Sequence, residues 1–242
     1  MKLQTAQKIL EQTKNSYDAI ASDFNQTRSY LWPGLKDFKK YVQPRDKVLD
    51  LGCGNGKLRL LFKDMPLDYF GVDSSSELLS VAEKRLDFKL NSQKFIQANV
   101  FKLPFSDNYF DVVFLVAVLH HLPGRELRLK TLAEIKRVLK PGGILVMTNW
   151  NRWQLNYLHY IIKHAWLKLI GHSDLDFKDI YLPWMKGKAF RYYHAFTLGE
   201  LKRLFSRSGL KLEKNYLAFW SGGRAARFDY FKAANLVSIA KK

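Results

Sequence analysis

Hydrophobic and polar positions follow one another in a repeated order between residues 48 and 148. Short apolar runs with the composition of buried strands are each followed by a turn and by a segment with the apolar spacing of a helix. Strands that alternate with helices form a mostly parallel sheet with helices on both faces. The pattern therefore predicts a doubly wound α/β fold, with strands at 48–51, 69–72, 94–97, 110–118 and 144–148 and helices at 57–63, 76–86 and 125–139.

The segments on either side of this core have other patterns. Helical spacing of apolar residues also occurs at 3–24, 34–41, 152–170 and 199–208, and two late strands are expected at 211–219 and 235–240. The two late strands could form a terminal hairpin. We therefore expect a single domain in three parts: a helical cap at 1–44, a ligand-binding core at 45–150, and a region at 151–242 that opens with a helical insertion after the fifth strand.

The charge of the chain is concentrated in the third part. The formal net charge is +18, and residues 1–47 carry 9 basic and 5 acidic side chains, residues 48–150 carry 14 and 11, and residues 151–242 carry 17 and 6. A net charge of +11 in the last region is typical of a surface that binds a polyanion such as nucleic acid. A generally basic protein and a surface for anionic lipid are the alternatives.

The cysteine content and the hydropathy of the chain indicate where in the cell the protein is located. The single cysteine, Cys53, excludes an internal disulfide and a cysteine-based zinc cluster. Residues 1–14 lack the apolar segment of a signal peptide, and no run of about 18 uncharged apolar residues could span a bilayer. We therefore expect a cytoplasmic protein without integral membrane contact and without a metal.

A glycine-rich turn follows the first strand of the core. The strand contains Asp50, and Gly52, Cys53, Gly54 and Gly56 come directly after it. Glycine allows unusual backbone dihedrals and a close approach to a ligand, and the start of the next helix offers free N–H groups to an anion. The residue after the third glycine is lysine, where the dinucleotide-binding pattern requires glycine. This spacing favours S-adenosylmethionine over a dinucleotide.

Side chains suited to an adenosyl ligand follow the next three strands. Asp73 can accept hydrogen bonds from both ribose hydroxyls, although capping the next helix is its alternative role. The amide of Asn99 is placed to meet the adenine edge. The expected donor contacts beyond the glycine turn are Asp73 and Ser74 after the second strand, Asn99 and Val100 after the third, and Ala117 and His120 after the fourth.

These motifs carry a resemblance to a known family. Residues 48–150 resemble the S-adenosylmethionine-dependent methyltransferases of the ubiquinone-biosynthesis type. The resemblance implies a Rossmann-like methyltransferase fold, a seven-stranded sheet whose last strand is antiparallel. It does not define the methyl acceptor.

The flanks have a more specific resemblance. Segments 17–24, 26–28, 32–33, 120–121, 179–184, 191–194 and 199–201, together with Asn235, resemble the tRNA wobble-uridine carboxymethyl methyltransferases. The resemblance implies esterification of a carboxymethyl group on uridine 34, contact with the anticodon loop, and a possible small activator subunit. Asn99 departs from the family pattern, which often has aspartate there, and this should change the adenine contacts modestly.

The implied chemistry suggests roles for residues near the acceptor. A carboxylate is already a nucleophile at neutral pH, so the protein has to hold it, align it and exclude water. Arg28 and Arg191 are candidates for this because arginine can bind a carboxylate through two N–H groups. His120, Tyr192 and His194 are the further candidate catalytic residues, and Tyr17 and Arg28 are also assigned to the donor site. Surface charge or backbone lining of the pocket is the alternative for each.

Two other functions fit the same sequence. The chain could methylate a small quinone-like or lipid-like acceptor, with segment 152–170 as a lid. It could also be a basic RNA-binding subunit that retains a donor site without turnover. An assay for methylation of tRNA distinguishes these two alternatives from a tRNA methyltransferase.

Overall fold

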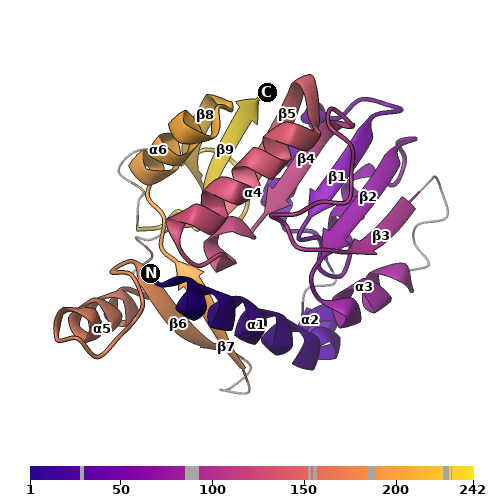
Figure 1. The fold of residues 1–242 in the computed structure, drawn as a ribbon. Coiled ribbons are helices and arrows are strands. Elements are labelled where there is room, and N and C mark those ends of the chain that lie inside the picture. Colours follow the sequence, from indigo (N-terminus) through magenta and orange to yellow (C-terminus); the bar gives the residue numbers. More distant parts are fainter. Residues whose placement is uncertain are drawn as a thin grey trace.

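The computed structural model describes residues 1–27, 30–84, 93–151, 154, 157–184, 189–225, 229 and 231–242. Seven strands form one sheet in the order β3-β2-β1-β4-β5-β9-β8 (Figure 1). Only β9 runs antiparallel to its neighbours, so the predicted fold class is confirmed. The strands are β1 Lys47–Leu51, β2 Asp68–Asp73, β3 Gln93–Gln97, β4 Phe110–Val116, β5 Leu139–Trp150, β8 Lys211–Ala218 and β9 Asn235–Lys241.

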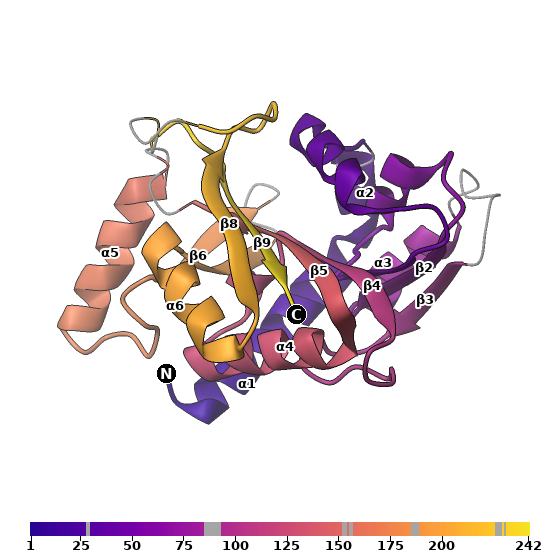
Figure 2. The ribbon, with the colours of Figure 1, turned by 90° about the horizontal axis from the view of Figure 1, so that it is seen from above.

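Helices cover both faces of this sheet, as Figures 1 and 2 show. Leucine and isoleucine side chains of α4 (Arg125–Val138) and α6 (Leu198–Ser208) pack into one core cluster. The 3-10 helices η1 (Pro33–Tyr41) and η2 (Lys57–Phe62) pack into a second cluster on the other face. Helix α3 (Ser76–Glu83) flanks β2 and β3. The carboxyl ends of the parallel strands are left for a ligand.

The N-terminal segment forms two helices, α1 (Leu3–Ala19) and α2 (Ala21–Thr27), so the prediction of one continuous helix over 3–24 is wrong. The break is at Ile20, whose side chain is buried and whose backbone has left the helical region. Burial of this one side chain turns the chain, and α2 then contacts α3 while α1 contacts β7 (Figure 1). Both helices thereby lie beside the ends of the strands.

The insertion after β5 contains strands as well as a helix. Helix α5 (Leu158–Leu169) is followed by β6 (Asp179–Trp184) and β7 (Ala189–His194), which pair antiparallel as a separate two-stranded sheet. The predicted helix of the insertion is present as α5, the strands β6 and β7 were not predicted, and the predicted helix residues 152, 153, 155 and 156 lie outside the described residues. Within the described part of the chain, no helix combines the length and the apolarity needed to cross a bilayer.

The ends of β4 and β5 differ from the sequence prediction. β5 begins at Leu139, which pairs with Phe110 before a register shift, so strand pairing starts five residues before the expected position 144. β4 ends at Val116 because Ala117 has a φ of 58°. This left-handed residue turns the chain out of the sheet and into the segment that carries His120.

Replacement of Gly71 in β2 by alanine is expected to destabilise the fold. A Cβ at this position would lie 2.5 Å from Cδ1 of Phe95 and 3.0 Å from Sγ of Cys53, so core side chains would have to shift. We expect the free energy of unfolding, measured in urea, to fall by about 1–3 kcal/mol. Gly199→Ala is the matched control, since a Cβ there meets open space in helix α6, and it should leave stability equal or higher. Equal stability of both variants would contradict this account of the β2–β3 packing.

Candidate active site

A cavity opens at the carboxyl ends of β1, β2 and β4. Its volume is about 560 Å³, within the range of small-molecule and cofactor sites. Side chains of α1, α2, β7 and the start of β9 close it from the other side. The predicted donor residues that line it are Tyr17, Asp50, Gly52, Cys53, Gly54, Asp73, Ser74, Asn99, Val100, Ala117 and His120.

The glycine turn forms the floor of the cavity next to β1. Gly52 has a φ of 76°, and a Cβ there would lie 2.3 Å from Cγ2 of Val118. Only glycine fits, because the turn needs both the left-handed backbone and the close approach. The amides of Gly52 and Cys53 both donate to the carbonyl of Val72, which ties the turn to β2.

Gly56 has a different role from the one predicted. Gly56 does not line the cavity. A Cβ there would lie 3.0 Å from Cβ of Ala82 and 3.2 Å from Cζ of Phe95, and φ is 70°. The assignment of Gly56 as a donor contact is therefore corrected: it lets η2 start and pack closely against α3.

Asp73 at the end of β2 is held by backbone amides. Its Oδ2 accepts from the N–H of Gly54 at 2.8 Å, and its Oδ1 accepts from the N–H of Ser75 at 3.0 Å. Burial raises the pKa of Asp73, and these backbone bonds oppose that effect. The carboxylate is thus fixed across the glycine turn, with its remaining lone pairs available to a hydroxyl-bearing ligand. The alternative role in helix capping belongs to Ser75, whose Oγ accepts from the N–H of Leu78.

Asp50 lies behind the turn and is buried. Its Oδ2 accepts from the hydroxyl of Tyr69 at 2.5 Å. Burial raises the pKa of Asp50 to about 7, although the Tyr69 hydrogen bond acts in the opposite direction. The folded chain therefore binds a proton at this carboxyl over a pH range in which the unfolded chain has lost it.

A pH-dependent contribution to stability follows from Asp50. Because the folded pKa is raised above 3.8, the free energy of unfolding should fall, by a few kcal/mol at most, as pH rises from about 4 to about 7. In Asp50→Asn the amide oxygen can still accept from Tyr69, but this titration is gone. We expect urea unfolding across that range to show a larger decline for the wild type than for the variant. Parallel curves for the two proteins would contradict the assignment.

Two neutral histidines and Tyr17 form the wall opposite the glycine turn. Nδ1 of His121 lies 2.9 Å from the carbonyl of Tyr192, which can only accept, so Nε2 accepts from the hydroxyl of Tyr17 at 3.0 Å. The N–H of Trp150 donates to Nδ1 of His120. Burial lowers the pKa of His121 to about 4 and that of His120 well below its ordinary value. Both rings are therefore uncharged at neutral pH.

Arg191 supplies a cation to the same wall. Its guanidinium lies 4.3 Å from the ring centre of Trp184 and 5.3 Å from that of Tyr193, a cation–π arrangement between two aromatic side chains. Its Nε is buried and makes no hydrogen bond to any described residue. A fixed guanidinium with an unused N–H is suited to an anionic group of an acceptor.

Tyr192 and His194 do not line the cavity, so their assignment as catalytic residues is corrected. Side chains alternate along β7, and those of Tyr192 and His194 point to the face opposite Arg191 and Tyr193. The hydroxyl of Tyr192 accepts from the guanidinium of Arg128 instead. His194 bonds to two carboxylates. The fifth candidate, Arg28, lies outside the described residues.

Several aromatic lining residues escaped the sequence prediction. Trp32 and Trp220, almost 190 positions apart, stack with ring centres 4.9 Å apart and planes at 5°. They line the cavity together with His121, Trp150, Tyr157 and Asn235. Trp32, Trp150 and Tyr157 were not predicted as site residues, because residues from the cap and the C-terminal region meet at the cavity through tertiary folding alone.

Comparison with known proteins defines the family. A family model described as a methyltransferase domain matches residues 49–147. A putative methyltransferase from Encephalitozoon cuniculi is 31% identical over 197 residues, which cover 81% of this chain and 85% of the relative. A solved structure of an S-adenosylmethionine-dependent methyltransferase from Methanosarcina mazei matches 88% of this chain and 98% of its own, with a TM-score of 0.70 and 24% identity. The chain belongs to the S-adenosylmethionine-dependent methyltransferases.

Two further relatives of the methyltransferase have names that specify an acceptor. A tRNA (carboxymethyluridine(34)-5-O)-methyltransferase from Arabidopsis thaliana is 34% identical over 55% of this chain, but the match spans only 31% of that relative. A protein of the same name from Schizosaccharomyces pombe is 26% identical and covers 80% of this chain and 86% of the relative. A putative methyltransferase from Haloferax volcanii, solved in complex with the Trm112 methyltransferase activator, has a TM-score of 0.65 and 22% identity over 95% of this chain and 96% of its own.

The cavity residues fit the predicted cofactor, S-adenosylmethionine. Gly52 and Gly54 of the glycine turn line the cavity, and Asp73 offers a fixed carboxylate for hydroxyl groups beside them. The methyltransferase therefore uses this cofactor. Among the described residues, no group of three histidine, cysteine or acidic side chains is arranged to hold a metal ion.

Proposed function

We propose that the methyltransferase esterifies a carboxyl group, and specifically the carboxymethyl group of wobble uridine 34 in tRNA. The observation that carries the proposal is Arg191, whose buried Nε has no hydrogen-bond partner among the described residues, in the wall of the cavity that Asp73 also lines. In this proposal residues 45–150 bind the methyl donor, and residues 1–44 and 151–242 build the acceptor side. The names of the Arabidopsis and Schizosaccharomyces relatives support the same acceptor.

The state of the wall residues suits this chemistry. The donor supplies an electrophilic methyl carbon on a sulfonium, and a carboxylate oxygen that accepts it has no proton to lose. His120 and His121 are neutral, so they add no positive charge beside a cationic donor. Arg191 instead orients the acceptor carboxylate, and the Tyr17–His121 hydrogen bond keeps the wall in place. The task of the protein is to bind, align and keep water out.

Charge and aromatic surface support tRNA as the acceptor. Residues 151–242 have a net charge of +11, which suits contact with phosphates. The indole of Trp220 is 46% exposed at the cavity and stacks on Trp32, so a base can stack on its other face. Contact of these groups with the anticodon loop, in the cytoplasm, is part of the proposal. Lys186, Lys188 and Arg227 of the same basic region lie outside the described residues.

An activator subunit is a further part of the proposal. The Haloferax protein of similar fold was solved with such a subunit, the Trm112 methyltransferase activator. The methyltransferase assay should therefore be run with and without a subunit of that class, because lack of turnover by the chain alone would otherwise be ambiguous.

The test is a labelling experiment on RNA. The methyltransferase is incubated with total RNA and a donor that carries a radiolabelled methyl group, and the product is divided into portions with and without mild alkali. We expect label on tRNA that alkali removes, since carboxyl esters hydrolyse readily in alkali. Alkali-stable label would place methylation elsewhere on the RNA and contradict the ester.

A small apolar acceptor is the second candidate. The observation that favours it is the exposed apolar side of α5, on which Ile162 is 61%, Trp166 59% and Leu169 73% exposed. A lid or lipid-contacting helix would have this character. In the same labelling experiment this candidate predicts no label on RNA but label on extracted organic-soluble acceptors. Donor binding without any labelled product would instead support a non-catalytic RNA-binding subunit.

A further inference from the structure

His194, at the end of β7, lies between two carboxylates. Its Nδ1 is 2.6 Å from Oδ1 of Asp179 in β6, and its Nε2 is 2.7 Å from Oε1 of Glu200 in α6. The ring is buried, with 3% of its surface exposed, and Asp179 has 0%. Neither the proposed ester chemistry nor the donor site uses this cluster.

The geometry defines the protonation of the ring. Carboxylate oxygens only accept hydrogen bonds, so both ring nitrogens of His194 have to donate, and this requires an imidazolium. The two distances lie at the short end of the charge-assisted range. Burial alone raises the pKa of Glu200, but hydrogen bonds from His194 and Lys178 outweigh it and lower that pKa to about 2. Glu200 is therefore ionised across the physiological range.

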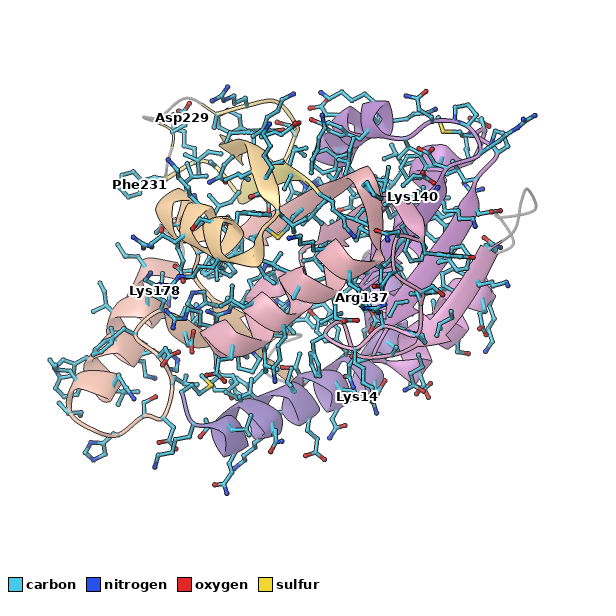
Figure 3. The ribbon with its side chains drawn as sticks, turned by 45° about the horizontal axis from the view of Figure 1, so that its top comes forward. Lys14, Arg137, Lys140, Lys178, Asp229 and Phe231 are labelled. Carbon is cyan, nitrogen blue, oxygen red and sulfur yellow. The ribbon has the colours of Figure 1, made fainter. Side chains whose placement is uncertain are left out.

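Charged groups of both signs surround His194. Lys178, before β6, donates to Oε2 of Glu200 at 2.7 Å, and Figure 3 shows Lys178 on the side of the molecule that carries α5 and α6. Arg128 of α4 lies 3.7 Å from Oδ1 of Asp179 and donates to the hydroxyl of Tyr192. The neutral ring of His120 is a further titratable group close enough to interact with His194. Two cations and two anions thus surround one imidazolium.

The cluster fixes the orientation of β7. It joins that strand to β6, α6 and α4 at one point, and Arg191 and Tyr193 lie on the opposite face of the same strand. Any rotation or slip of β7 that moves these two side chains in the cavity wall has to break both His194 bonds. A neutral ring would turn a lone pair toward a carboxylate and weaken the same contacts.

We propose that His194 is a positioning residue whose imidazolium locks β7 onto β6 and α6, so that Arg191 and Tyr193 form the acceptor wall only while both ring nitrogens are protonated. The inference concerns the shape of the acceptor site and holds for any acceptor that Arg191 contacts. It rests on the proposed function only where methylation of tRNA serves as the readout.

The direct test is the ¹⁵N NMR spectrum of the histidine side chains in the full chain, with His194 assigned by comparison with His194→Gln. At pH 7 we expect two protonated nitrogens in the His194 ring. An unprotonated ring nitrogen would overturn the proposal. This measurement needs no acceptor, so its outcome is independent of whether tRNA is the substrate.

Two variants test the consequence for turnover. In His194→Ala the donor dissociation constant should stay within about twofold of wild type, while kcat/KM for the acceptor falls by about 100-fold, the effect of a misplaced holding group. His172→Ala, at an exposed histidine, is the matched control and should leave both unchanged. Wild-type kcat/KM in His194→Ala would overturn the proposal.

Glu200→Gln distinguishes positioning from a merely structural role. The glutamine amide can donate to an unprotonated Nε2 of His194, so a neutral ring is satisfied in this variant. Glu200→Gln should therefore keep kcat/KM within a few-fold of wild type, far above that of His194→Ala. Equal losses of kcat/KM in the two variants would overturn the proposal. Absence of tRNA methylation by the wild type together with an imidazolium in the spectrum would instead reject the proposed acceptor alone.

Discussion

Asp73→Ala is expected to weaken binding of the methyl donor by about 100-fold or more, the largest effect of any single change on the donor side. The carboxylate bridges the N–H groups of Gly54 and Ser75 and presents its free lone pairs to the cavity. Its removal takes away the hydrogen bonds that the ribose hydroxyls are expected to donate to this charged group, each worth about 1.5–3 kcal/mol, and leaves two amides without their partner. Isothermal titration with the donor or its demethylated product measures the change.

A matched control separates the loss of donor contacts from the general effect of removing one negative charge. Asp64→Ala removes an exposed carboxylate on the loop before β2, outside the cavity, and should bind the donor as the wild type does. Asp73→Asn should be intermediate, because its amide oxygen can accept only some of the bonds. Donor affinity in Asp73→Ala equal to that of Asp64→Ala would show that the donor lies elsewhere.

Arg191→Ala is expected to have the opposite signature: donor binding unchanged, turnover lost. The guanidinium lies between Trp184 and Tyr193 in the proposed acceptor wall. Truncation of one partner of a buried charge pair costs about 2–5 kcal/mol, which corresponds to a fall in kcat/KM of tens-fold to thousands-fold. Arg191→Lys should recover part of the activity, since a lysine keeps the charge but not the two-pronged geometry.

The control for Arg191 is Arg203, an exposed arginine of α6 that does not line the cavity. Arg203→Ala should lower kcat/KM only slightly, as the loss of one phosphate contact would. The difference from wild type should diminish as the salt concentration rises. Steady-state kinetics and donor titration on both variants give the comparison. Full turnover in Arg191→Ala would show that another group holds the acceptor.

The sequence was most informative where local chemistry decides the structure. Glycine follows the strand at 48–51 because the turn there needs a left-handed backbone and a close approach of the chain. Asp73 follows at the end of the next strand. Of these residues, Asp50, Gly52, Gly54 and Asp73 line one cavity, whereas Gly56 does not. Composition alone also placed the positive charge in the last third of the chain.

The prediction was weakest where tertiary contacts decide. β6 and β7 pair only with each other, and Pro183 near the end of β6 obscures a strand pattern. Without β7 as a strand, residues 191–194 could not be divided into a cavity face and a buried face, and Tyr192 and His194 were placed with Arg191. The break at Ile20 has the same cause, because burial of one side chain against the rest of the fold redirects the helix.

The measurement that tests the central claim most directly uses a donor with a deuterated methyl group and mass spectrometry of the nucleosides from the treated tRNA, with the activator subunit present. We predict that carboxymethyluridine from the wobble position gains one deuterated methyl as an ester, and that Arg191→Ala, which binds the donor normally, fails to add it. Deuterated methyl on any other nucleoside, or on the wobble uridine at equal rate in the Arg191 variant, would contradict the account.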